Sequence, residues 1–130
     1  MIAARGVAAL IGVPLMLVAV WMVVAPGSWF HSFPGVALSG SFNPHLVRDL
    51  GVAFGVAGAG FTWSALRPLG ALPIVVSSSA FLAGHAVIHI AEMLSGASGH
   101  HRVLADALAV HIPAVLGLIC AVIWWRHSRR

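Results

Sequence analysis

Three ionisable side chains lie in an otherwise apolar stretch of the chain. His85, His89 and Glu92 are spaced i, i+4 and i+7. At about 100° per residue these positions fall within roughly 60° of one another, so in a helix they share one face. Ionisable groups at membrane depth are costly and rarely face lipid, so such a face is first interpreted as a site. Two imidazoles one turn apart can bind one metal ion, and a nearby carboxylate can complete or orient the ligands.

Two other segments offer the same donor types. His45 and Asp49 repeat the i, i+4 spacing, and His111 lies in the last apolar segment. Imidazole and carboxylate together suit copper, zinc or iron. The sequence therefore predicts a site for one of these ions, with His85 and His89 as first ligands and Glu92 in support. The full set of predicted ligands is His85, His89, His45, Asp49, His111 and Glu92.

Two other classes of function stay open. A b-type haem needs axial histidines on opposite sides of its plane, which His85 and His111 could supply at matched depth. His85 and His89 could not, because both project from one side; a quinone held by His and Asp is a related alternative. The third class is a non-catalytic accessory subunit of a larger respiratory, photosynthetic or oxygenase membrane complex. The sequence holds no catalytic nucleophile, phosphate loop or dinucleotide motif, so any enzymatic activity would come from a bound metal or cofactor.

Other polar residues have plainer interpretations. Asp106 lies about 140° around a helix from His111 and four residues after Arg102, so we expect an ordinary ion pair with that arginine. His100 and His101 follow a Gly/Ser-rich turn and are either solvated or deliver metal to the site.

Composition places the chain in a membrane. Of its 130 residues 60% are hydrophobic and 8% charged, and the mean hydropathy is +0.99. A soluble domain carries about a quarter charged residues, so we expect an integral membrane protein with the lipid bilayer as its main partner. The arginines are scattered over helix ends and form no basic patch, which argues against nucleic-acid binding.

Apolar runs and breakers predict an all-α, integral membrane four-helix bundle in a single domain, 1–130. The expected helices cover about 7–25, 45–66, 71–94 and 102–125, and the Pro-, Gly- and Phe-containing stretch 26–44 is expected to be an interfacial loop. Asn43-Pro44 is a good helix start. Gly51 and Gly55 form a small-xxx-small face that would let another helix, or another membrane subunit, approach closely.

Arginine placement predicts the topology. With four spans both termini share one side, and that side collects five arginines: Arg5, Arg67, Arg126, Arg129 and Arg130. The positive-inside rule then places both termini in the cytoplasm of a multi-pass protein of the bacterial inner (plasma) membrane. All the acidic residues and most histidines fall in the outer half, so the site would face the periplasmic or extracellular side.

One stretch carries a family resemblance. Phe42-Asn43-Pro44-His45-Leu46-Val47-Arg48-Asp49-Leu50-Gly51, followed by His85-x-x-x-His89, resembles a family of small four-helix bacterial membrane proteins. Its members carry F-N-x-H-x-x-R-D-x-G and a later H-x-x-x-H helix, and the resemblance covers most of the chain. It implies that His45, Arg48, Asp49, His85 and His89 matter as a set. The family carries no established activity, so the expected function, metal handling or metal-dependent redox chemistry, comes from the residues alone.

Overall fold

The computed structural model describes residues 1–37, 40–95 and 106–129, and every regular element in these ranges is a helix. The long helices are α1 (Ile2–Val24), α4 (Pro44–Leu66), α5 (Leu72–Leu94) and α7 (Ile112–Ser128), the last continuing directly from a π-helix, η2 (Ala107–His111). Two short helices, α2 (Pro26–Ser32) and α3 (Pro34–Ala37), follow α1. The all-helical prediction is confirmed.

The stretch expected to be an irregular loop is partly helical. Pro26 and Pro34 begin α2 and α3, because proline lacks an N–H that a first helical turn does not need and already has a helical φ. Phe30 of α2 is buried with Met22 of α1 and Val47 of α4. The connection therefore packs against the ends of α1 and α4, and the loop prediction is wrong for these residues.

The start of α4 is the one predicted from sequence. The side-chain oxygen of Asn43 accepts hydrogen bonds from the backbone N–H groups of His45 and Leu46, at 3.0 and 3.2 Å. Pro44 occupies the first turn. The cap satisfies two donors that have no partner within the helix.

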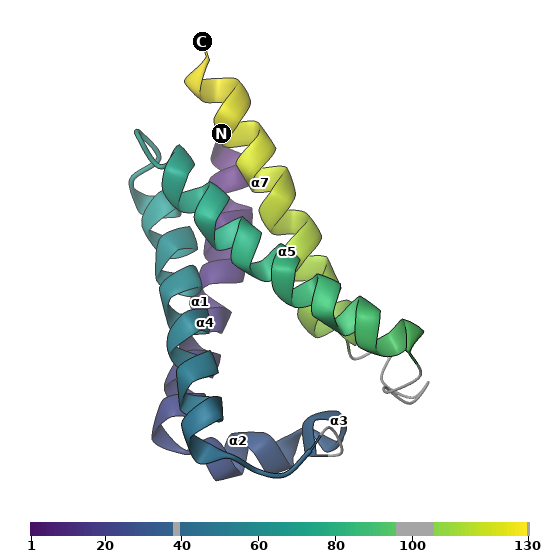
Figure 1. Ribbon diagram of the computed structural model, residues 1–130. Coiled ribbons are helices and arrows are strands. Elements are labelled where there is room, and N and C mark those ends of the chain that lie inside the picture. The colour runs from purple at the N-terminus through teal and green to yellow at the C-terminus, as the bar shows by residue number, and fades with distance from the viewer. Residues whose placement is uncertain (38–39, 96–105, 130) are drawn as a thin grey trace.

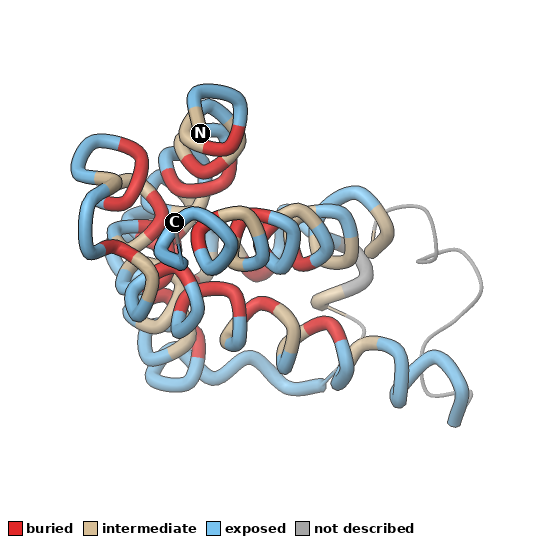
Figure 2. Tube along the Cα trace, turned by 90° about the horizontal axis from the view of Figure 1, so that it is seen from above, coloured by how far each residue is buried: buried red, intermediate tan, exposed pale blue. Residues whose placement is uncertain are grey.

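The long helices form two pairs (Figure 1). α1 packs mainly against α4, and α5 mainly against α7. The pairs meet at the end of the molecule where both termini lie and diverge toward the opposite end. Seen from above in Figure 2, α5 and α7 run sideways from α1 and α4.

Small residues bring α1 and α4 into backbone contact. A Cβ added to Gly12 would lie 2.7 Å from the carbonyl oxygen of Gly58, and one added to Gly58 would lie 2.8 Å from that of Gly12. At Gly51 an added Cβ would meet Met22 at 2.8 Å, and at Gly55 it would meet Ala19 at 3.4 Å. The predicted small-residue face exists, and the helix that approaches it closely is α1 of the same chain. Contact of this face with another subunit stays a prediction.

One serine and one tryptophan link α7 to the neighbouring segments. Ser79 of α5 donates a buried hydrogen bond to the carbonyl of Gly117 in α7, at 2.7 Å. The indole of Trp124 donates to the carbonyl of Pro68, in the turn between α4 and α5, at 3.2 Å. Hydroxyl-to-backbone bonds of this kind are typical of helix contacts in lipid, where no water can replace them.

Among the described residues, three helices are long and apolar enough to cross a membrane: α1, α5 and the continuous segment Ala107–Ser128. Their outward surfaces carry many exposed large apolar side chains, among them Leu17 and Val87. α4 has the same 23-residue length as α1 and α5. His45, Arg48 and Asp49 and its several glycines lower its hydropathy, and it is not among the three. The chain is a helical protein whose apolar helices are compatible with a lipid bilayer.

Replacement of Gly12 by alanine should destabilise the protein, because the new methyl group would meet the backbone of α4. We expect a loss of about 1–3 kcal/mol, typical of overpacking. Thermal unfolding in detergent, followed by circular dichroism, measures the effect. Gly6→Ala in the same helix is the control, since an added Cβ there meets no atom within 4 Å. Equal melting temperatures for the two variants would contradict the close contact.

Candidate functional site

A histidine–aspartate pair joins α5 to the segment that enters η2. Nδ1 of His89 lies 3.1 Å from Oδ2 of Asp106, and both side chains are only 17% exposed. An ionised carboxylate can only accept, so Nδ1–H of the imidazole donates. The bond gives both polar groups a partner within an apolar protein, where an unpaired group is costly.

Aromatic rings surround the neighbouring histidine. The His85 ring meets Phe54 of α4 edge-on, with centroids 5.2 Å apart, and lies nearly parallel to Phe81 at 6.4 Å. Its closest ring contact is His89, at 4.6 Å between centroids. The i, i+4 spacing therefore brings these two imidazoles together as expected.

His111 makes a contact within its own chain segment. Its Nδ1 lies 3.0 Å from the backbone carbonyl oxygen of Asp106. Its Nε2 is buried and has no hydrogen-bond partner among the described residues. A carbonyl oxygen is an acceptor only, so Nδ1 carries the proton and Nε2 presents a free lone pair.

A π-helix separates Asp106 from His111, whose ring contacts the Asp106 carbonyl. The N–H of Ile112 bonds the carbonyl of Ala107, five residues back, as a π-helix requires. Residues five apart then lie closer to one face than in an α-helix, which would separate them by about 140°. The sequence interpretation set Asp106 apart from the histidines on the assumption of a regular α-helix, whereas the structure brings its carboxylate to His89 and its carbonyl to His111.

The structure places the α4 pair separately. Nε2 of His45 lies 3.3 Å from Oδ2 of Asp49, with the side chains 85% and 62% exposed. No hydrogen bond, ion pair or ring contact within the described ranges joins either residue to α5 or η2. Glu92 is exposed, and its carboxylate bonds no described residue. His100, His101 and Arg102, the expected partner of Asp106, lie outside the described residues.

The predicted ligands are thus gathered only in part. Within residues 1–37, 40–95 and 106–129, no three His, Cys, Asp or Glu side chains lie close enough together to hold a metal ion. His85 and His89 are adjacent, while no contact of the described residues joins the His85 and His111 rings expected to flank a haem. The arrangement can offer imidazole lone pairs to an ion, and the histidines would have to move together to surround it.

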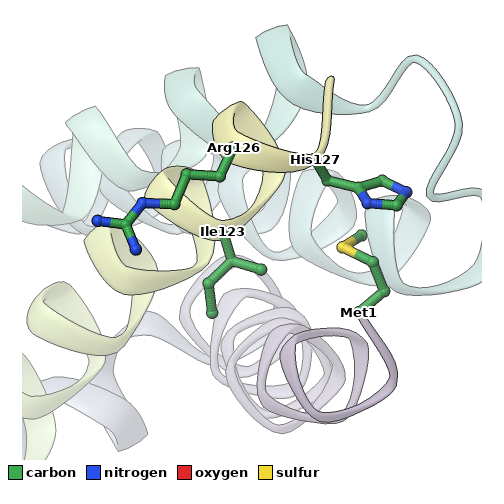
Figure 3. A pocket seen from close by; sticks show the side chains of 4 residues that line it. All are labelled: Met1, Ile123, Arg126 and His127. Atoms are coloured by element: carbon green, nitrogen blue, oxygen red, sulfur yellow. The ribbon is translucent and has the colours of Figure 1, made fainter. Parts of the chain in front are cut away.

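The surface hollow drawn in Figure 3 lies away from these histidines. It is lined by Met1 at the start of α1 and by Ile123, Arg126 and His127 near the end of α7. The His127 ring points toward the Met1 side chain, while Arg126 extends to the other side. The hollow therefore belongs to the end of the molecule that carries the termini.

Comparison with protein-family models, curated proteins and solved structures finds no match to this chain. The resemblance drawn from the F-N-x-H-x-x-R-D-x-G stretch stays a prediction.

Sequence reasoning missed three residues around the histidines. Phe54, Phe81 and the carboxylate of Asp106 all contact them. Two signals in the sequence could have found them. Phe81 lies four residues before His85 and so on the same helix face. Pro113 indicates an irregular helix, because a proline inside a helix clashes with the carbonyl four residues back, which is within η2.

His45 should react faster than His111 with diethyl pyrocarbonate, which modifies unprotonated imidazole nitrogens. The His45 side chain is 85% exposed, whereas Nε2 of His111 is buried and its Nδ1 is hydrogen-bonded. Peptide mass spectrometry of the detergent-solubilised protein should show at least a several-fold difference in rate. Denatured protein provides the control, in which the rates should converge; equal rates in the folded protein would argue against the described burial.

Proposed function

We propose that the chain is a membrane-embedded metal-binding protein whose imidazole nitrogens, from α5 and η2, bind copper, zinc or iron. One observation carries the proposal: Nε2 of His111 is buried without a hydrogen-bond partner among the described residues. An unsatisfied buried polar atom costs about 1–3 kcal/mol. A metal ion supplies the partner that a bare imidazole lone pair needs.

The α5 histidines supply the other donors. Nδ1 of His89 is engaged with Asp106, so Nε2 is its free nitrogen, and the His85 ring lies beside it. A metal ion would draw His111 toward this pair and join α5 to η2. Three imidazoles leave at least one coordination position for water or a substrate, which suits metal handling or metal-dependent redox chemistry. His45, Asp49 and Glu92 lie outside this proposed set.

We further propose that α4 is the fourth span of a membrane bundle with cytoplasmic termini. At 1.5 Å per residue its 23 residues reach about 34 Å, enough for a hydrocarbon core of about 30 Å. Arg5, Arg67 and Arg126 gather at the end of the molecule where the termini lie. The positive-inside rule favours that end as cytoplasmic, with the histidines in the outer half of a bacterial inner membrane.

Elemental analysis of the purified protein should find stoichiometric copper, zinc or iron. His89→Ala and His111→Ala should each lose most of it, because each removes a proposed ligand. His127→Ala is the matched control, since this histidine lies at the opposite end of α7. Metal content that is unchanged in both ligand variants would refute the proposal.

An absorption spectrum of the same sample separates the alternatives. The proposed site has no Soret band, and a Soret band would favour haem bound by His85 and His111 instead. Protein that is free of both metal and haem, and co-purifies with large membrane subunits, would favour an accessory role.

A reporter that is active only in the cytoplasm should be active when it is fused after Arg130. A reporter inserted between α3 and α4 should read as external, because an odd number of spans separates the two positions in the proposed topology. Two cytoplasmic readings would exclude α4 as a span, and an external reading after Arg130 would overturn the orientation.

A further inference from the structure

We propose that Asp106 is a positioning residue that sets the tautomer of two histidines at once. Its carboxylate contacts Nδ1 of His89 at 3.1 Å, and its backbone carbonyl contacts Nδ1 of His111 at 3.0 Å. The use that these tautomers would serve rests on the proposed metal-binding function. The tautomers themselves can be tested without a metal.

Both contacts dictate where the imidazole proton lies. A neutral imidazole carries one N–H, and the other nitrogen is an acceptor. The carboxylate and the carbonyl are acceptors only, so each bonded Nδ1 must carry the proton. His89 and His111 therefore both present a bare Nε2, the state in which imidazole binds a metal ion.

The bonds also set the direction of each ring. A histidine ligand is commonly held by an oxygen acceptor on its second nitrogen, which orients the ring and raises its basicity. The Asp106 carboxylate is itself 17% exposed, so little water competes for this bond. His85 makes ring contacts but no hydrogen bond with a described residue, so it has no comparable anchor.

The π-turn is what lets one residue serve both histidines. Asp106 is the N-cap of η2, five residues before His111, and its carbonyl reaches the His111 ring while its side chain reaches across to α5. A regular α-helix would turn the two residues about 140° apart. We infer that the π-turn ahead of Pro113 helps to orient the rings of His89 and His111.

The tautomers can be read from imidazole ¹⁵N chemical shifts of the metal-free protein, at a pH where both rings are neutral. In the wild type, His89 and His111 should both be in the Nδ1–H form. In Asp106→Ala, His89 should change to the Nε2–H form, which free histidine prefers, while His111 stays unchanged because its acceptor is the backbone. His111 is thus the internal control, and it also reports whether the π-turn survives.

Two results would overturn the inference: an Nε2–H form of His89 in the wild type, or no change of His89 in Asp106→Ala. If Asp106→Ala does not fold, Asp106→Leu takes its place, because leucine is close to aspartate in size and offers no acceptor. His89 should again change to the Nε2–H form, and an unchanged Nδ1–H form in this variant would contradict an anchoring role.

Zn²⁺ titration then tests the purpose of the anchor. Asp106→Ala should bind Zn²⁺ about 10–100-fold more weakly than the wild type, with Asp106→Asn closer to the wild type. Equal affinity in the wild type and Asp106→Ala would show that the anchor does not serve metal binding. A wild type that binds no added Zn²⁺, Cu²⁺ or Fe²⁺ would refute the proposed function. The tautomer assignment depends on the ¹⁵N spectra alone and would be unaffected.

Discussion

Every polar group placed among apolar helices must find its partner inside the protein, because lipid offers none. The described contacts follow this constraint closely. Ser79 bonds a backbone carbonyl of the neighbouring helix, Arg5 bonds the carbonyl of Ala65, and His89 bonds Asp106. Against this background the buried Nε2 of His111 stands apart, since it lacks a partner among the described residues. The exception draws attention to the α5–η2 region as a site.

Two kinds of packing divide the molecule. Glycines let α1 and α4 approach until backbone meets backbone, at Gly12 and Gly58. Where α5 meets the start of η2, the contacts include an ionisable pair, His89 with Asp106. Close apolar packing tolerates little displacement, whereas a few polar side chains on diverging helices can rearrange around a bound ion.

Asp106 illustrates how an irregular helix can gather donors. Its side chain and its backbone each engage one histidine. π-turns occur often at functional sites because they shift the direction of the following side chains without ending the helix. Here the π-turn lies between Asp106 and His111, whose ring contacts the Asp106 carbonyl. A single residue can then orient histidines from two elements.

Composition and local pattern were enough to predict the helical class. Apolar runs, proline and the Asn43 cap predicted two of the four long helices, α4 and α5, to within a residue at each end. The i, i+4 spacing was enough to place His85 beside His89, because both positions belong to one regular helix. Only the tertiary structure decided that α1 covers the glycines of α4 and that Asp106 joins the histidines. Helix periodicity places neighbours along one helix, but contacts between helices depend on their crossing and on a local π-turn that shifts the phase.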